Sequence, residues 1–547
     1  MPGSKQTFLL PLAIFLTQSG IALSVTDPVV TTTLGLIRGV KADDGDYNMF
    51  MGIPYGRVNQ SNPFGKAIPQ EPFNGMFDAI HDTAMCPQMD EFNRTFVGSL
   101  DCLHLNIYVP TNPSSSPKPV MVMIHGGGFI FGAAGRFKYG PKYLVNNDVI
   151  LVTINYRLGI YGFMCLATPE IPGNEGLKDQ VLALRWIKKH IKAFGGDPNK
   201  ITAFGNSVGA LSVDFHMVSP QEKLFDQIIL QSGSSLFLRR ETPTIEMNKN
   251  AIFRLTRHFW NKPDEASPDN LNEALNFLAT VNPTDMIAAC FQLFAFFGPC
   301  LEERFEGVEG ILIEDWRKAS IPKAKQMPVL IGVTDQEALS SINSLRNEIN
   351  NNFIRSYLDF AFKTDDPKFE GMYDLVQSFY LGDRNITDVN NNILYVINFI
   401  SDFWYNYRVI KTVQKYLDYG ASGIFLYIFS YIGERNLGRN QNNVAIGGAA
   451  HTDELGYLYD MSFYDKANEA DQLTIDRMAA LWTNFAKYGN PTPGTSALLP
   501  VEWKPITNGS ASHYLEVDKE LTAKTRPFQK SMAFWELFYR ANADLRK

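Results

Sequence analysis

Short hydrophobic runs recur along the chain and are separated by stretches with a helical repeat. Because the runs are continuously apolar rather than alternating with polar residues, they predict strands that are buried on both faces of a sheet. Most are rich in valine and isoleucine, which is typical of strands. The runs occupy residues 120–124, 149–154, 201–204, 228–230, 329–331 and 424–429.

Helical patterns lie between these runs. After Asp179 an apolar stripe recurs with helical spacing at Val181, Leu184, Ile187 and Ile191. Alternating strands and helices predict an α/β fold with a large, mostly parallel sheet and helices on both faces. Residues 240–320 and 340–420 hold longer helical stretches, which we interpret as insertions that cover the sheet rather than as independent domains.

The end of the first helix is also marked in the sequence. Gly195-Gly196 predicts where the helix stops. Asp197-Pro198 predicts a turn that leads into the next strand.

Composition narrows the class of protein. The chain has 547 residues, of which 45% are hydrophobic and 20% charged, as in an ordinary globular protein. Lys and Arg total 50 against 57 Asp and Glu, so the net charge is −7. A nucleic-acid scaffold would need a basic stripe, so we expect no nucleic-acid partner. Aromatic residues make up 13%, which fits either a large core or a deep apolar pocket.

The first 24 residues resemble a secretory signal peptide. Lys5 precedes a nine-residue apolar run, Phe8–Leu16, and Ala22-Leu23-Ser24 resembles a cleavage site. The run is too short to span a bilayer, and Pro11 argues against a buried helix. No later apolar run approaches about 18 residues. We therefore predict a secreted protein whose residues 25–547 form one domain without a stable membrane span.

Secretion makes two covalent modifications plausible. The five cysteines can form disulfides in an oxidising compartment. Cys86 and Cys102 are 16 residues apart, and Cys290 and Cys300 are 10 apart, whereas Cys165 lies in an apolar stretch and is expected to be a free thiol. Closing loops of this size stabilises a fold by roughly 2–3 kcal/mol each in the chain-entropy model. Glycosylation is possible at the sequons Asn59, Asn93, Asn385 and Asn508.

No cysteine or histidine cluster has zinc-site spacing, so we expect no metal.

A candidate nucleophile lies in the G-x-S-x-G pattern of residues 205–209. The pattern follows the strand at 201–204 and precedes a helical stretch that begins near Ala210. A serine on such a sharp turn adopts a strained backbone, so small residues are needed on both sides. The following helix points its positive end at developing negative charge. These features indicate that Ser207 is the nucleophile. The alternative is a Gly-rich turn with only a structural role, which would have a similar sequence.

A glycine-rich loop follows the strand at 120–124. It reads His125-Gly126-Gly127-Gly128-Phe129. Its N–H groups, with the N–H of Val208, are suited to hold the oxyanion of a tetrahedral intermediate. A flexible turn is one alternative. A phosphate-binding loop is another, but no G-x-x-x-x-G-K-[ST] pattern occurs here.

A serine nucleophile needs a base, which in this architecture follows it in the chain. Four histidines qualify: His216, His258, His451 and His513. His216 lies on the helix that the serine begins, His258 on an amphipathic helix, and His513 at a late strand. His451 follows small residues in a loop after a strand, so we expect it to be the base.

The acid that orients the base must lie between Ser207 and His451. The segment directly after the buried run 329–331 contains two carboxylates, Asp335 and Glu337. Position and composition leave both open as the acid.

Several blocks of the sequence together resemble one family. They are residues 50–55, 99–106, the glycine-rich loop, 155–159, the serine turn, 231–233, 448–457 and 482–491. On these blocks the chain resembles the type-B carboxylesterase/cholinesterase family of the α/β-hydrolase superfamily, from about Gly35 to Phe534. The block GAAHTDELGYLY is similar to insect secreted and antennal esterases.

The resemblance implies a Ser-Glu-His triad and so selects Glu337 as the acid, with Gly127, Gly128 and Val208 forming the oxyanion hole. No cofactor is implied. Cys86 with Cys102 matches the family's first disulfide. Cys290 with Cys300 lies in the region of the second, although the family usually has an aliphatic residue at position 300.

Three positions depart from the family pattern. Before the nucleophile the family usually has Glu or Gln, and this chain has Asn206. After the nucleophile the family usually has Ala, and this chain has Val208. After the acid the family usually has Gly, and this chain has Ala338. We expect the β-branch of Val208 to crowd the acyl group. Asn206 removes a negative charge near the imidazolium, which would lower activity or change its pH optimum.

The sequence therefore predicts a secreted carboxylic-ester hydrolase. Phe291, Phe294, Phe296 and Phe297 lie where the family builds its acyl pocket, which favours apolar ester substrates, although the same residues would suit an ordinary core. An alternative is a catalytically weak or inactive relative that binds ligands or mediates adhesion. Acetylcholine hydrolysis is not favoured, because the segment around Cys86 lacks a tryptophan.

Overall fold

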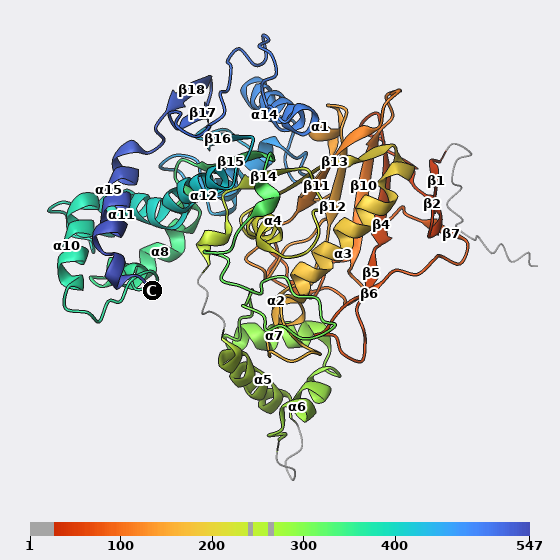
Figure 1. Cartoon of the computed structure of the whole chain (residues 1–547), viewed down its shortest axis with the longest axis horizontal. Coiled ribbons are helices and arrows are strands. Elements are labelled where there is room, and N and C mark those ends of the chain that lie inside the picture. The colour runs from red at the N-terminus through yellow and green to blue at the C-terminus, as the bar shows by residue number, and fades with distance from the viewer. Residues whose placement is uncertain (1–26, 239–243, 261–266) are drawn as a thin grey trace, which may run out of the picture.

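A computed structural model describes residues 27–238, 244–260 and 267–547 (Figure 1). The predicted signal peptide, residues 1–24, lies outside the described residues. One eleven-stranded sheet runs through the molecule in the order β18-β17-β16-β15-β14-β13-β11-β12-β10-β4-β3. The strands are, in that order, Leu521–Thr525, His513–Val517, Gly423–Phe429, Pro328–Thr334, Gln227–Gln231, Gly196–Asn206, Lys118–Ile124, Ile150–Ile154, His104–Pro110, Tyr47–Pro54 and Val40–Lys41.

All six predicted apolar runs are strands of this sheet. They form β11, β12, β13, β14, β15 and β16, and every neighbouring pair among them is parallel. Antiparallel pairing is confined to the two ends, where β18 adds to β17 and β10 and β4 extend the sheet beyond β12. The predicted α/β class with a mostly parallel sheet is confirmed.

The sheet is buried because successive side chains of a strand enter different cores. On β11, Val120, Val122 and Ile124 pack into one core, whereas Met121 and Met123 pack into another. The first core is covered by α3 (Glu175–His190), α4 (Val208–Val218) and α12 (Tyr407–Asp418), and the second mainly by α14 (Glu469–Tyr488). Each fully buried aliphatic side chain stabilises the fold by about 1.5–3 kcal/mol.

Helix α3 carries the apolar stripe expected after Asp179. Val181, Leu184 and Ile187 are buried, and the helix is continued by a 3₁₀ turn to Phe194. Gly195 then ends it with φ of 84°, a conformation that favours glycine. The turn predicted at Asp197-Pro198 is wrong, because β13 already begins at Gly196.

The two predicted helical segments contain most of the remaining helices. In Figure 1, α5 (Ile245–Phe259), α6 (Leu271–Leu278) and α7 (Pro283–Gln292) gather at the bottom of the view. The second segment contains α8 (Ile342–Glu348), α10 (Phe369–Tyr380) and α11 (Val389–Ile400), which pack with the late helix α15 (Gln529–Ala541) around a third core. Among the described residues, no helix is long and apolar enough to cross a membrane.

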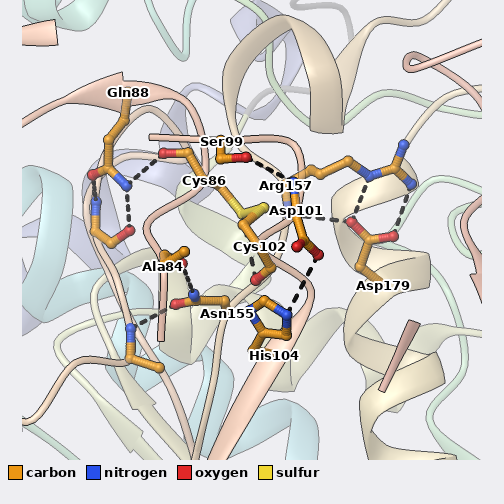
Figure 2. The surroundings of a disulfide bond; sticks show 12 residues. Ala84, Cys86, Gln88, Ser99, Asp101, Cys102, His104, Asn155, Arg157 and Asp179 are labelled. Carbon is orange, nitrogen blue, oxygen red and sulfur yellow. Dashed lines mark hydrogen bonds and ion pairs between the residues drawn. A yellow bond between two sulfur atoms is a disulfide. The ribbon is translucent and has the colours of Figure 1, made fainter. Parts of the chain in front are cut away.

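Two disulfides are present, and only one matches the prediction. Cys86 is bonded to Cys102, as expected (Figure 2). The predicted pairing of Cys290 with Cys300 is wrong, because Cys300 is bonded to Cys165, which the sequence suggested was free. Cys290 is instead a free thiol, buried on α7.

The unexpected pairing has a structural cause. Asn174, just before α3, donates from its side-chain amide to the Cys300 carbonyl at 2.8 Å and accepts the Cys300 N–H at 3.0 Å. These two bonds hold Cys300 against the segment that contains Cys165. The partners are 135 residues apart, so no sequence spacing could have indicated the bond.

Candidate active site

Ser207 lies on a sharp turn between β13 and α4. Its φ is 57° and its ψ is −126°, an uncommon backbone conformation for a residue with a side chain. Its N–H donates to the Gln231 carbonyl at the end of β14, at 2.8 Å. A side chain at Gly209 would collide with the Ile124 carbonyl, so the turn can pack on β11 only with glycine there. The predicted strand-turn-helix context of Ser207 is confirmed.

Glu337 and His451 meet at the same edge of the sheet. Glu337 follows the end of β15, and His451 lies in the loop that follows β16. The His451 Nδ1–H donates to Glu337 Oε2 at 2.6 Å, and the His451 backbone N–H donates to the Glu337 carbonyl at 3.1 Å. The imidazole is thereby held in one tautomer, with Nε2 left as the basic nitrogen.

The carboxylate of Glu337 is itself fixed by two further donors. The Ser232 hydroxyl donates to Glu337 Oε1 at 2.6 Å, and the Thr334 backbone N–H donates to the same oxygen at 2.8 Å. Its side chain is fully buried. Contacts with Ser232, Thr334 and His451 thus hold this side chain in place.

The rival carboxylate, Asp335, has a different partner. It accepts the Ala449 backbone N–H at 2.6 Å and so holds the loop that carries His451. Burial raises the pKa of Asp335 to about 7, against the opposing effect of that hydrogen bond. Asp335 therefore contacts the loop backbone, and Glu337 contacts the imidazole.

The other histidines lie elsewhere. His216 is buried on α4, with its Nε2 2.8 Å from Gln180 Oε1 on α3. His258 is exposed in the last turn of α5, and His513 begins β17.

The glycine-rich loop packs directly on the serine turn. A Cβ at Gly126 would lie 2.6 Å from the Asn206 carbonyl and 3.3 Å from the Ser207 Cβ. Gly127 and Gly128 have φ of 113° and 66°, which favour glycine. Val208 is the first residue of α4, and the first N–H groups of a helix have no partner within the helix. Backbone N–H groups are thus concentrated around Ser207.

The disulfide loop supports this arrangement from outside (Figure 2). Gln88 donates to the carbonyls of Cys86 at 3.0 Å and Gly132 at 2.9 Å, and it accepts the Gly132 N–H at 2.6 Å. Gly132 belongs to the segment after the glycine-rich loop. Nearby, Arg157 binds Asp179 of α3 through two side-chain bonds, at 2.7 and 2.8 Å. The Gln88 contacts connect the disulfide loop to the segment after the glycine-rich loop, and the Arg157 contacts hold α3.

A second carboxylate, which the sequence did not single out, lies beneath the site. Glu454 Oε1 accepts the side-chain amides of Asn206 at 2.9 Å and Gln231 at 3.0 Å. Burial, followed by the charge of Glu337, raises the pKa of Glu454 to about 7. The sequence offered only the position of Glu454, three residues after His451, as a signal.

These carboxylates determine the protonation of His451. Burial lowers the pKa of this imidazole, but the charge and hydrogen bond of Glu337, with the charges of Glu454 and Asp453, outweigh burial and raise it. Asn206 directs its amide to Glu454, so the negative charge that Asn206 cannot provide is supplied by Glu454.

Two cavities are lined by residues close in the chain to the site residues, since Ala338 follows Glu337 and Ile130 lies two residues after Gly128. One, of about 320 Å³, is lined by Ala338, Tyr405, Phe360 and other mostly apolar residues, and the Tyr405 ring lies 5.2 Å from the His451 ring. The other is small, about 20 Å³, and lies between Ile130 and the phenylalanines of the segment after α7. Phe297 is buried there, whereas Phe294 is 79% exposed. The predicted aromatic cluster is therefore part core and part surface.

The described part of the chain places no group of three or more His, Cys, Asp or Glu side chains where they could hold a metal ion.

A model of the carboxylesterase family matches residues 26–535. The chain belongs to the carboxylesterase family. This carboxylesterase is 32% identical to juvenile hormone esterase of Tribolium castaneum, covering 86% of this chain and 85% of that protein. It is also 32% identical to esterase E4 of Myzus persicae, and the match covers 87% of this chain and 88% of that protein. Acetylcholinesterase of Danio rerio is 27% identical, and the match covers 91% of this chain and 86% of that protein.

A solved structure resembles the whole molecule. The crystal structure of juvenile hormone esterase from Manduca sexta, with OTFP covalently attached, has a TM-score of 0.77 and 26% identity. The match covers 94% of this chain and all of that one. The predicted family and α/β-hydrolase fold are confirmed, and the carboxylesterase is a carboxylic ester hydrolase.

Proposed function

We propose that this carboxylesterase is a secreted enzyme that hydrolyses apolar esters through an acyl-enzyme on Ser207. The observation that carries the proposal is the contact of 2.6 Å between His451 Nδ1 and Glu337 Oε2. It lies at the edge of the sheet where the strained turn presents Ser207. A nucleophile, a base and an orienting acid are thus supplied by three neighbouring loops.

In the proposed reaction, Ser207 Oγ attacks the ester carbonyl carbon while His451 Nε2 takes the hydroxyl proton. The carbonyl oxygen becomes an oxyanion, held by the N–H groups of Gly127, Gly128 and Val208. His451 then returns the proton to the leaving alcohol, and the C–O bond breaks. Water then attacks the acyl-enzyme carbonyl carbon while His451 Nε2 takes one of its protons. The same nitrogen returns that proton to Ser207 Oγ as the acyl C–O bond breaks, which releases the carboxylic acid. Glu337 stabilises the imidazolium throughout.

Apolar substrates are supported by the walls of the site. The larger cavity has space for an organic group and is lined by Trp404, Tyr405, Ile400 and similar residues. A covalently attached ligand in the solved relative agrees with covalent chemistry on this fold. The β-branch of Val208, next to the nucleophile, favours small acyl groups over bulky ones.

Secretion is supported by the predicted signal peptide and by two disulfides. The side chains of Asn93, Asn385 and Asn508 are exposed and that of Asn59 is partly exposed, so all four sequons are accessible to glycosylation.

Replacement of the nucleophile tests the proposed mechanism. We expect Ser207→Ala to reduce kcat for a p-nitrophenyl ester by about 10³-fold or more while the fold survives. A serine-directed organophosphate should label Ser207 in the parent protein, as located by mass spectrometry. Near-normal turnover of Ser207→Ala would contradict the assignment.

The base has a matched control in the same chain. His451→Ala should lose activity to a similar extent, whereas His258→Ala, at an exposed helix position, should retain it. Full activity of His451→Ala would assign the base to another residue. A folded parent protein without activity on any ester would favour the alternative of a non-catalytic binding protein.

A further inference from the structure

A large cavity lies apart from the catalytic residues. It has a volume of about 610 Å³ and is bounded by α12, α15 and residues 317–319. Ser207, Glu337 and His451 do not line it. Its volume is within the range of about 300–1,000 Å³ that is typical of small-molecule sites.

The charge of this cavity is opposite to that of the molecule. Among the described residues that line it, eight are Lys or Arg and two are Asp or Glu, whereas the whole chain carries a net charge of −7. Like charges that converge on one cavity repel one another, and a bound anion would relieve that repulsion.

Carboxylates of the protein balance only part of this charge. Glu536 lies 3.3 Å from Lys411 and 2.7 Å from Arg540, so one acid serves two cations. Arg317 and Lys547 pair with Asp315 and Asp359, which do not line the cavity.

Three cations of the cavity have no carboxylate in contact with them among the described residues. Within the described residues, no carboxylate oxygen lies within 4 Å of the charged groups of Lys318, Lys415 and Arg546. Lys415 donates to the Trp316 carbonyl at 2.9 Å, and burial lowers the pKa of its ammonium despite the charges of Asp214 and Asp315. An anion in the cavity would stabilise the charged form of this lysine.

Aromatic rings line the same cavity. Tyr539 and Tyr407 stack with ring centroids 4.8 Å apart, and the Arg546 guanidinium lies 5.4 Å from the Tyr539 ring. Phe360 also lines this cavity. Rings beside cations suit a ligand that has an apolar body as well as a charged group.

We propose that this cavity binds a small organic anion of the phosphate- or sulfate-ester class, with its charged group toward Lys318, Lys415 and Arg546 and its apolar body against Tyr539. A phosphate monoester is close to a dianion at pH 7.5, since its second pKa is about 6. Its several oxygens can accept hydrogen bonds from more than one cation at once.

Calorimetric titration of the full chain with phenyl phosphate at pH 7.5 tests the proposal. We expect one molecule to bind per chain, at least tenfold more tightly than phenol or inorganic phosphate, and more weakly as NaCl is added. Phenyl sulfate, measured alongside, distinguishes the two ester types. Absence of saturable binding of both esters, or binding that salt does not weaken, would overturn the proposal. Binding no tighter than that of inorganic phosphate would overturn the role of the aromatic wall.

Charge-reversal variants locate the bound anion. Lys318→Glu with Arg546→Glu should weaken phenyl phosphate binding by at least tenfold and leave ester hydrolysis unchanged. The control pair, Lys192→Glu with Lys223→Glu, makes the same charge change at exposed sites elsewhere and should alter binding less than twofold. Equal effects of the two pairs would overturn the location.

Two further variants keep this test independent of folding and catalysis. Lys318→Gln with Arg546→Gln is a milder change for use if charge reversal impairs folding, and it should still weaken binding severalfold. Ser207→Ala should bind phenyl phosphate as the parent does, because Ser207 does not line the cavity. Loss of binding in Ser207→Ala would place the anion in the active site and overturn the proposal.

Discussion

Glu454 is a buried carboxylate whose charge acts on the candidate base. Its Oε1 accepts two amides, from Asn206 and Gln231, while no described residue donates to its Oε2. Its ionised form raises the pKa of His451, and its own pKa is raised to about 7. The two groups therefore titrate as a coupled pair over the pH range in which the base must become neutral.

Replacing this carboxylate should alter the pH profile. In Glu454→Gln the charge is removed, so the pKa of His451 falls and the acid limb of kcat/KM moves to lower pH by about one unit or less. The profile is measured with a neutral p-nitrophenyl ester. Glu314→Gln, at an exposed position, makes the same charge change and should leave the limb in place. A limb that moves to higher pH would show that Glu454 does not act on the base.

Adding a carboxylate at position 206 tests the same effect in the opposite direction. Asn206→Glu would place a second carboxylate beside Glu454, and adjacent carboxylates share a proton because both cannot readily ionise. Their combined charge still raises the pKa of His451, so the acid limb should move to higher pH. The exchange Asn206→Glu with Glu454→Gln leaves one carboxylate in the pair and should return the limb close to its original position. An exchange that does not restore the limb would mean that the two positions are not equivalent around His451.

At the scale of elements, parallel pairing brings the proposed catalytic residues to one edge of the sheet. Strands β13, β14, β15 and β16 pair in parallel, so their carboxyl ends lie at one edge of the sheet. Ser207, Glu337 and His451 all follow these ends. The Ser207 N–H bonds to the end of β14, and the Ser232 N–H bonds to Gly332 of β15 at 2.8 Å. The loops are thus fixed to neighbouring strands as well as to each other.

The contact between α3 and α4 predicts sensitivity to acid. Burial, with the nearby charge of Lys323, lowers the pKa of His216 to about 3, compared with 6.5 when unfolded. The folded state therefore binds fewer protons than the unfolded state between these values, and stability falls as the pH drops below 6.5.

Removing the histidine should flatten this dependence. Between pH 6.5 and 4.5 we expect the free energy of unfolding to fall by about 2 kcal/mol less in His216→Gln than in the parent. The size follows because one pKa unit corresponds to about 1.4 kcal/mol. Urea unfolding at the two pH values measures the difference. His258→Gln, on the exposed face of α5, should behave like the parent. An unchanged difference in His216→Gln would show that this imidazole does not control the acid response.

At the scale of the whole molecule, the second disulfide joins distant segments. Cys165 follows α2 (Gly159–Phe163), and Cys300 follows the insertion that contains α5, α6 and α7. The bond holds the end of this insertion against the start of α3. The phenylalanine segment that flanks the smaller cavity lies just before Cys300, so the bond also limits movement of one wall of the site.

Loss of this bond should destabilise the molecule more than loss of the free thiol. Cross-linking residues 135 apart is worth up to about 5 kcal/mol in the chain-entropy model. We expect Cys165→Ser with Cys300→Ser to lower the free energy of unfolding by several kcal/mol. Cys290→Ala, which removes a buried thiol outside any bridge, should cost about 1 kcal/mol.

Non-reducing peptide mapping gives a direct check of this pairing. It should recover Cys86 with Cys102 and Cys165 with Cys300, and it should find Cys290 alkylated only after unfolding. A peptide that links Cys290 to Cys300 would contradict the assignment.

The sequence by itself determined the features that depend on neighbouring residues. Continuous apolar runs were sufficient for the six central strands, because a strand buried on both faces consists mostly of apolar side chains. The serine turn and the glycine-rich loop were recognisable, since close backbone approach requires glycine within a few residues of the chemistry. The place of His451 in a loop after a strand made it the expected base.

Only the tertiary structure decided the features that depend on contacts between distant segments. Asp335 and Glu337 are two residues apart at one strand end, and the path of the loop after β16 determines which of them contacts His451. Cys300 bonds to Cys165 because packing against Asn174 brings them together across 135 residues. Glu454 gains its influence from burial and from contacts with Asn206 and Gln231, at the ends of two neighbouring strands. In each case the deciding energy comes from packing and desolvation between segments, which no local pattern encodes.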